Sequence, residues 1–314
     1  MKKIEIKEND SKQTLIKFLQ KYFKGAPKSL IQKFIRLKRI KVNGKKQDSS
    51  YSLEEGDIVD IYIYDEVIDE WRNSASENSV KSKLNLNIAF ENDDVVIIDK
   101  PADILSHAAS SEDYGKTVVD FLISYLIDKG DYVPRLEQSF RPAIVNRLDR
   151  NTKGLIIGAK NRNSLLALNE AIDTDLVEKH YLAIVEGKFT GKKEIVNYLS
   201  KDDNNVVHVN HEGIGKKSVT LIKSLEAGSE YSLVEIKLLT GRTHQIRASL
   251  KELGHPIVGD RKYFNRQFRI KGVNSQQLLA YKLAFSKNIE IESLRGLEVV
   301  SKYQEELIST FNKL

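Results

Sequence analysis

Residues 219–239 constrain the fold most, because they predict two antiparallel strands joined by a short turn. Runs of β-favouring residues lie on both sides of the tetrapeptide Ala227-Gly228-Ser229-Glu230. An antiparallel hairpin disfavours a doubly wound parallel sheet. Further strands are expected at residues 88–90, 95–98, 155–157, 181–185 and 278–285, and helices at residues 117–127, 162–172 and 243–253. This mixture predicts an α+β domain built on a large mixed or antiparallel sheet.

A strongly basic segment near the N-terminus predicts a module that binds nucleic acid. Residues 11–46 contain twelve Lys or Arg and no acidic residue, whereas residues 51–70 contain eight Asp or Glu and no basic residue. Apolar residues in the basic segment form a helical stripe, and the pair Asn43-Gly44 predicts a tight hairpin turn. We expect RNA phosphates to be contacted by Lys28, Lys33, Arg36 and Arg39. The alternative is a solvated helix face, but such faces usually carry charges of both signs.

A polar, aperiodic segment separates this module from the rest of the chain. Residues 73–82 are mostly small or polar, which is typical of a flexible linker. We therefore expect a small basic RNA-binding domain over residues 1–70, a linker over residues 71–83 and a larger domain over residues 84–314.

Composition excludes several classes of protein. With 314 residues, 40% of them hydrophobic, the chain can bury a sizeable core. It has no apolar run of the roughly 18 residues needed to cross a membrane, and its first residues lack a secretory apolar core. It has no cysteine, and its six histidines lack the spacing of metal ligands. We expect a soluble, cytoplasmic, monomeric protein without a metal or an organic cofactor.

Asp149 is the first candidate for a catalytic residue. It lies between Arg147 and Arg150, just before the apolar run at residues 155–157. A nearby cation favours the ionised form of a carboxylate in a poorly hydrated pocket, because the opposite charge offsets desolvation. Such a carboxylate can act as a nucleophile or a base. Taken alone, however, the same pattern more often marks an exposed charge cluster in a turn.

Three segments together resemble the RluA-type pseudouridine synthases, which isomerise uridine in RNA. The first contains Asn146-Arg147-Leu148-Asp149 and Thr152-Lys153-Gly154-Leu155, the second is residues 178–187, and the third contains Thr240-Gly241-Arg242-Thr243-His244-Gln245-Ile246-Arg247 with residues 254–260. The family usually has His and Ser where this chain has Asn146 and Lys153. The Arg-Leu-Asp core of the first segment is intact.

The resemblance implies a pseudouridine synthase fold over residues 84–314 and a role for each matching residue. Asp149 would be the catalytic aspartate, Arg247 its charge partner, and Tyr181 the ring that stacks on the target base. Further RNA contacts are expected from Arg147, which would serve near the flipped base, and from Arg242 and His244. Lys100 and His107 lie in a segment that matches the family less well, so they are weaker candidates for RNA contacts.

The N-terminal block resembles the small αL RNA-binding motif shared by a ribosomal small-subunit protein and tyrosyl-tRNA synthetases. With this module, the resemblance predicts an RNA pseudouridine synthase that acts by base flipping and an aspartate-dependent rearrangement of the glycosidic bond. By analogy, its substrate is expected to be large-subunit ribosomal RNA. Two alternatives stay open. One is an inactive RNA-binding or ribosome-assembly protein of the same fold, which Asn146 and Lys153 would favour, and the other is a hydrolase that releases free uracil.

Overall fold

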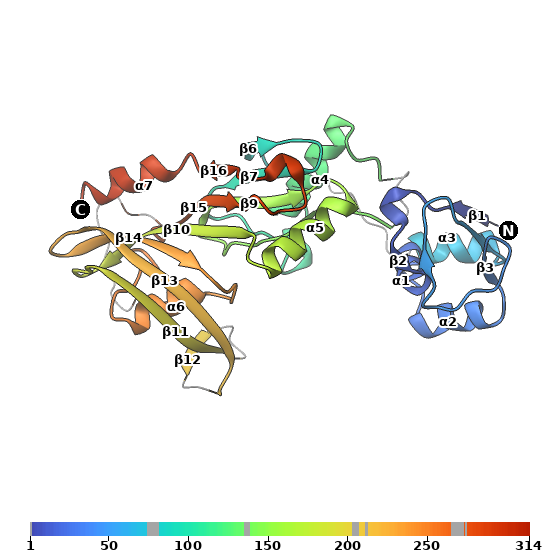
Figure 1. The fold of residues 1–314 in the computed structure, drawn as a ribbon, viewed down its shortest axis with the longest axis horizontal. Coiled ribbons are helices and arrows are strands. Elements are labelled where there is room, and N and C mark those ends of the chain that lie inside the picture. The colour runs from blue at the N-terminus through green and yellow to red at the C-terminus, as the bar shows by residue number, and fades with distance from the viewer. Residues whose placement is uncertain are drawn as a thin grey trace.

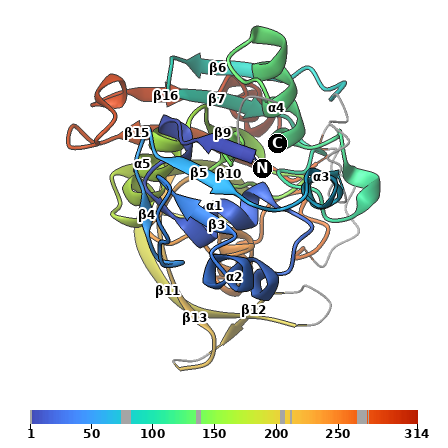
Figure 2. The same ribbon diagram turned by 90° about the vertical axis from the view of Figure 1, so that its right-hand side faces the viewer.

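The computed structural model describes residues 2–73, 82–134, 139–202, 207–210, 213–264, 273 and 275–314. Residues 74–81, the middle of the predicted linker, lie outside the described residues. The N-terminal elements lie at one end of the molecule, beside helix α5 (Arg162–Asp173), and the large sheet extends away from them (Figure 1). Figure 2 looks along the molecule from this N-terminal end.

The N-terminal elements enclose a small apolar core of their own. Helices α1 (Leu15–Tyr22) and α2 (Lys28–Arg36) pack against a three-stranded antiparallel sheet, and helix α3 (Asp65–Asn73) adds Trp71, whose ring meets Phe23 edge to face at 5.4 Å. The strand order in this sheet is β1 (Lys2–Glu5), β5 (Ile58–Ile61), β3 (Ile40–Val42). A separate antiparallel pair is formed by β2 (Gln13–Thr14) and β4 (Ser52–Leu53), and the 3-10 helix η1 (Glu8–Asp10) precedes β2.

Two features predicted for this part are confirmed. Asn43 and Gly44 form the tight turn, with φ angles of 52° and 72°, a backbone that Asn and Gly adopt most readily. In α2 the apolar residues Ile31 and Ile35 are buried. The basic side chains expected to contact RNA are exposed, namely Lys28, Lys33, Arg36 and Arg39.

The rest of the described chain is organised around an eleven-stranded mixed sheet. Its main path is β12 (Val207–Asn210), β11 (Lys192–Lys201), β13 (Lys216–Ala227), β14 (Tyr231–Leu238), β10 (Val177–Glu186), β15 (Leu278–Phe285), β9 (Lys153–Ala159), β7 (Val95–Lys100), β6 (Asn87–Glu91). Strand β16 (Glu298–Val300) pairs with β15, and β8 (Ala143–Ile144) pairs with β9. The predicted hairpin is β13 with β14, in which Ile222 faces Ile236. Among the described strand pairs, only β15 and β9 run parallel.

Helices cover both faces of this sheet. Helix α4 (Val118–Lys129) and α5 begin at the capping residues Thr117 and Asn161, as the sequence pattern indicates. Helix α6 (Gln245–Glu252) lies near β11, β12 and β13, and α7 (Gln304–Phe311) covers the opposite face beside β10 and β14. Two 3-10 helices, η2 (Ser111–Asp113) and η3 (Glu292–Leu294), complete the described elements. No helix in the described ranges is long and apolar enough to cross a membrane.

The sequence-based assignment needs two corrections. Helix α6 begins at Gln245 and not at Thr243, because His244 adopts a left-handed backbone with a φ angle of 50°. Strands β1, β2, β8, β11, β12 and β16 and helices α1, α3 and α7 were not predicted.

Candidate active site

A cavity of about 290 Å³ opens where the loop before β9, strand β10 and the start of α6 meet. Each of the three sequence segments contributes to its wall, although they lie far apart in the chain. The predicted site residues that line it are Arg147, Asp149, Tyr181, Arg242, His244 and Arg247. The four basic residues of the N-terminal module are not part of this wall.

Arg247 joins two carboxylates at this cavity. Its Nη1 donates to Oδ2 of Asp149 at 2.8 Å, so the two residues expected to pair lie in contact. Its Nε and Nη2 donate to the two carboxylate oxygens of Asp260 at 2.7 and 2.9 Å. The side chain of Asp260 is fully buried, whereas that of Asp149 is 28% exposed. Asp260 therefore fixes the guanidinium, which presents its remaining edge to Asp149.

The charges of this triad support one another. Burial by itself lowers the pKa of Arg247, but the hydrogen bonds and charge of Asp260, and then those of Asp149, outweigh it and raise the pKa above its ordinary value. Arg247 is thus a permanent cation. The ring of Tyr263 lies below this cation, 5.0 Å from the centre of the guanidinium, and adds a cation–π contact.

The loop around Asp149 is held by three side chains from other parts of the chain, two of which bond to its backbone. Ser106 Oγ donates to the carbonyl of Leu148 at 2.7 Å and accepts from its N–H at 3.0 Å. Lys100 Nζ donates to the carbonyl of Arg150 at 2.9 Å. Gln276 Nε2 donates to Thr152 Oγ1 at 3.1 Å. The loop is therefore ordered before any substrate arrives, which is what a preorganised site requires.

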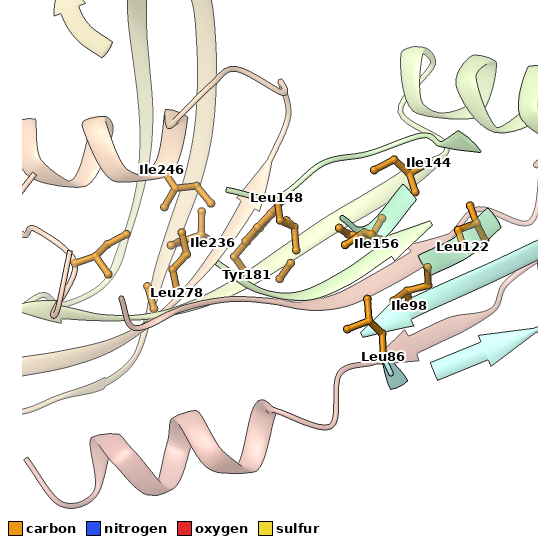
Figure 3. Packing of buried hydrophobic residues seen from close by; sticks show 14 of the residues in the cluster. Leu86, Ile98, Leu122, Ile144, Leu148, Ile156, Tyr181, Ile236, Ile246 and Leu278 are labelled. Atoms are coloured by element: carbon orange, nitrogen blue, oxygen red, sulfur yellow. The ribbon is translucent and has the colours of Figure 1, made fainter. Parts of the chain in front are cut away.

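Tyr181 lies on the central strand β10, opposite Ile236 of β14 and Ala280 of β15. It is buried in an apolar cluster that includes Leu148 and Ile236 (Figure 3). Burial raises the pKa of Tyr181 well above its usual value, and the negative charge of Asp149 adds to the effect. Its phenol therefore stays protonated, and its ring gives the cavity an aromatic wall.

Gln245 fastens the turn that carries the basic residues of the third segment. Its Oε1 accepts from Thr240 Oγ1 at 2.8 Å and from the N–H of Arg242 at 3.0 Å. Its Nε2 donates to the carbonyl of Val219 and to Thr220 Oγ1. The buried amide therefore joins this turn to strand β13, and this needs both a donor and an acceptor at the start of α6.

The remaining predicted RNA contacts lie at the edge of the cavity. Arg147 is exposed and donates from Nη2 to Thr243 Oγ1 at 3.0 Å, which links the first and third segments. Arg242 is also exposed and donates to the carbonyl of Lys217. Lys100 is completely buried, so the structure contradicts its expected role as an RNA contact: its ammonium supports the Asp149 loop instead.

The two departures from the family pattern have structural roles. Asn146 donates from Nδ2 to the carbonyl of Leu155 and accepts from the N–H of Ile157, so it ties the segment to β9. Lys153 pairs with Glu306 of α7 at 2.7 Å. Neither contact alters the triad of Asp149, Arg247 and Asp260.

Two residues of the site were not singled out from the sequence. Asp260 ends the predicted segment 254–260, and Tyr263 follows it. A Gly-Asp pair after a turn was the available signal, but only the fold brings it to Arg247. Within the described ranges, no group of three or more His, Asp or Glu residues is placed to hold a metal ion.

Comparison with protein families decides the assignment. Residues 94–252 match the family model for RNA pseudouridylate synthases, and residues 13–59 match that for the S4 domain. The chain belongs to the RNA pseudouridylate synthase family. It is an isomerase that converts uridine into pseudouridine in RNA, and it carries an S4 domain in the N-terminal part where the αL-type module was expected.

Curated relatives extend over most of the chain. It is 33% identical to an uncharacterized RNA pseudouridine synthase of Mycoplasma capricolum, over 94% of this chain and 93% of that protein. It is also 33% identical to the ribosomal large subunit pseudouridine synthase C of Haemophilus influenzae, over 94% of this chain and 90% of that protein. Among solved structures, human RNA pseudouridylate synthase domain containing 4 has a similar fold, with a TM-score of 0.56 at 20% identity over 73% of this chain and 92% of that chain.

Proposed function

We propose that this synthase modifies specific uridines of large-subunit ribosomal RNA, as a monomer in the cytoplasm. The observation that carries the site assignment is the contact of Asp149 with the fixed cation of Arg247 beside the aromatic wall of Tyr181. The substrate class rests on the names of relatives such as the large-subunit enzyme of Haemophilus influenzae. The S4 domain and its exposed basic helix α2 support binding to a structured RNA.

The cavity fits a single nucleotide turned out of its RNA. Unstacking the target base costs a few kcal/mol, and stacking on Tyr181 returns about 1–3 kcal/mol. Arg147 at the edge has a planar cation that is suited to stack on neighbouring bases or contact phosphate. We assign it, with Arg242 and His244, to contacts with the RNA around the flipped uridine.

Asp149 would carry the chemistry at the glycosidic bond. Its carboxylate either attacks the sugar or the base or removes a proton from the sugar, and in each case the bond between C1′ and N1 breaks. The uracil turns within the cavity, a bond forms between C1′ and C5, and Asp149 returns to its starting state. The proton on C5 leaves to solvent, and N1 takes up a proton. No energy source is needed, because the reaction rearranges the atoms of one nucleotide.

The basic face of α2 would bind the RNA at a distance from the cavity. Lys28, Lys33, Arg36 and Arg39 are all exposed on or just after this helix. Each phosphate contact releases counterions, so affinity falls with salt by a slope of about 0.7–0.9 per contact on a logarithmic scale. Such contacts select a folded RNA without touching the reacting uridine.

Asp149→Asn tests this function. RNA tritiated at C5 of uracil is incubated with the protein, and released tritium and free uracil are measured separately. The unmodified protein should release tritium without free uracil, and the variant should lose this activity by at least about 10³-fold while it still binds RNA. Asp103→Asn is the matched control, because that exposed aspartate lies outside the cavity wall and pairs with Arg150 at 2.7 Å. Asn146→His should stay within about tenfold of the unmodified protein.

Three outcomes would contradict the assignment. Tritium release that survives in Asp149→Asn would remove Asp149 from the reaction. Labelled free uracil would indicate a base-removing hydrolase. Binding without either product would indicate an inactive RNA-binding or ribosome-assembly protein.

A further inference from the structure

His244 lies between a tyrosine hydroxyl and the carboxylate of Asp149. Its Nδ1 is 2.8 Å from the hydroxyl of Tyr263, and its Nε2 is 3.7 Å from Oδ2 of Asp149. The left-handed backbone of His244, with a φ angle of 50°, turns the ring into this place. A non-glycine residue in that conformation costs about 1–3 kcal/mol and persists only where the surroundings hold it, often at active sites.

The two neighbours of the ring, Asp149 and Tyr263, favour one tautomer of His244. The Tyr263 oxygen accepts from the N–H of Val207 at 3.2 Å, and in the tautomer that the Asp149 charge favours, the Tyr263 hydroxyl donates to Nδ1 of His244 at 2.8 Å. A neutral imidazole that accepts at Nδ1 carries its hydrogen on Nε2. That N–H points toward the Asp149 carboxylate, which favours the same tautomer electrostatically. Both sides of the ring therefore select one state.

The charges around the ring keep it neutral near pH 7. Burial lowers the pKa of His244 below its ordinary value of 6.5, the charge of Asp149 opposes this shift, and that of Arg247 reinforces it. More weakly, Lys262 lowers this pKa and Asp260 raises it. Tyr263 is the remaining titratable group in contact with the ring, and burial raises its pKa, so it keeps its proton.

The contacts of the Asp149 carboxylate fall on one oxygen. Arg247 and His244 both approach Oδ2, and no described residue donates a hydrogen bond to Oδ1. We propose that His244 is a positioning residue: in the tautomer that Asp149 and Tyr263 favour, it holds Oδ2 together with Arg247 and leaves Oδ1 to meet the uridine. This inference rests on the proposed role of Asp149 and adds a two-residue device that orients it.

Tyr263→Phe tests the device through its pH profile. Without the hydroxyl, the neutral ring is free to carry its proton on Nδ1 and to turn a lone pair toward Asp149. We expect single-turnover tritium release to fall about tenfold at pH 8, the size of one lost hydrogen bond. As the pH falls toward 5.5, a growing share of the ring becomes imidazolium, which carries protons on both nitrogens, so the ratio of variant to unmodified rate should rise toward one.

Tyr281→Phe is the matched control, because it also removes a tyrosine hydroxyl. That hydroxyl donates to Glu235 at 2.5 Å, and Tyr281 does not line the cavity. Its rate relative to the unmodified protein should not change between pH 5.5 and 8. A ratio for Tyr263→Phe that is equally low at every pH would overturn the proposal, since that is the result of a purely structural defect.

The tautomer is measured directly by long-range ¹⁵N–¹H NMR of the histidine-labelled protein, with the His244 signals assigned from their loss in His244→Gln. We expect the Nε2–H tautomer at pH 8 in the unmodified protein, and an Nδ1–H tautomer there would overturn the proposal. If the unmodified protein releases no tritium from RNA, the proposed function fails, and the NMR result still decides where the proton lies.

Discussion

Arg247 makes Asp149 usable because its guanidinium is already fixed by another carboxylate. Asp260 binds two nitrogens of the guanidinium and is fully buried, so the cation has one direction left in which to donate. Oδ2 of Asp149 accepts from Nη1 of Arg247 at 2.8 Å, while 28% of the Asp149 side chain stays exposed. Removing one partner from a buried ion pair typically costs about 3–5 kcal/mol, so Asp260 is as much a part of the fold as of the site.

Lys100 should make stability depend on pH. Its side chain is fully buried, and burial lowers its pKa to about 7, with smaller opposing effects of Asp149 and Asp103. The native state therefore binds fewer protons than the unfolded state between about pH 7 and the ordinary lysine pKa of 10.5, and stability from this residue rises with pH across that window. Below pH 7 the native state carries the full cost of a buried charge.

Lys100→Met measures this effect. The stability of the variant relative to the unmodified protein should be greater at pH 6 than at pH 9, by a few kcal/mol in the free energy of unfolding. Urea unfolding at both pH values provides the numbers. Lys153→Met is the control, because that lysine is partly exposed and paired with Glu306. If this difference in stability does not change with pH, Lys100 has the same charge in the native and in the unfolded protein.

Sequence resemblance placed Asp149, Tyr181 and Arg247 at one site, and the fold brings all three to one cavity. The residues that hold these three side chains in place could not be predicted in the same way. Ser106, Gln276 and Asp260 come from separate elements, and each reaches the site through contacts that depend on the packing of the whole sheet. A local pattern of polar residues carries no information about such distant partners.

At the level of elements, Gly154 explains why β9 and β15 lie so close beside the catalytic loop. Gly154 pairs with Ala280 in the parallel contact of the two strands, and its φ angle is +117°. A Cβ atom here would overlap the carbonyl oxygen of Ala280. Since Ala280 also pairs with Tyr181, this close approach sets the distance between the loop of Asp149 and the wall of the cavity.

Gly154→Ala should therefore damage both stability and activity. We expect a loss of more than about 2 kcal/mol, because the backbone of a neighbouring strand must move, and a fall in tritium release of at least tenfold at saturating RNA. Gly191→Ala is the control: its φ angle is +79°, but its Cβ would meet nothing within 4 Å. If the two variants lose the same stability, backbone strain alone accounts for the effect and the close approach does not matter.

Strands with a clear apolar run were predicted, and strands without one were missed. Strand β7 has six consecutive buried residues, and its apolar part, residues 95–98, was found. Strand β11 has only two buried residues among ten, so its sequence of mixed lysines and apolar residues gives no strong period. Its place is determined by pairing with β13, which a local sequence pattern does not encode.

For the molecule as a whole, the junction between the N-terminal part and the large sheet is polar and well bonded. Arg162 Nη2, at the start of α5, donates to the carbonyl of Lys12 at 3.2 Å, and Asn163 Nδ2 donates to Glu8 Oε1 at 2.7 Å. Ser139 donates to Asp10 at 2.5 Å, and Asp10 is 1% exposed. These contacts fix the basic helix α2 relative to the cavity.

A fixed distance between helix α2 and the cavity matters only for an RNA that contacts both. Such an RNA binds at two places at once, and the second contact gains from a high effective concentration that a freely moving domain would lower. In Figure 1, α2 and α6 both lie below the central strands, so one RNA can approach them from the same side. The junction would therefore act on substrate affinity and leave the chemical step unchanged.

Arg162→Ala combined with Asn163→Ala tests this at the junction. We expect KM for a large-subunit ribosomal RNA transcript to rise about tenfold, with kcat within twofold of the unmodified protein. A short hairpin that contains the same uridine and fills only the cavity should show no change in KM. Arg295→Ala, which removes an exposed arginine before β16, should leave both substrates unaffected. An equal rise in KM for transcript and hairpin would mean that the junction supports the cavity itself, because a loss of domain orientation weakens only the RNA that reaches α2.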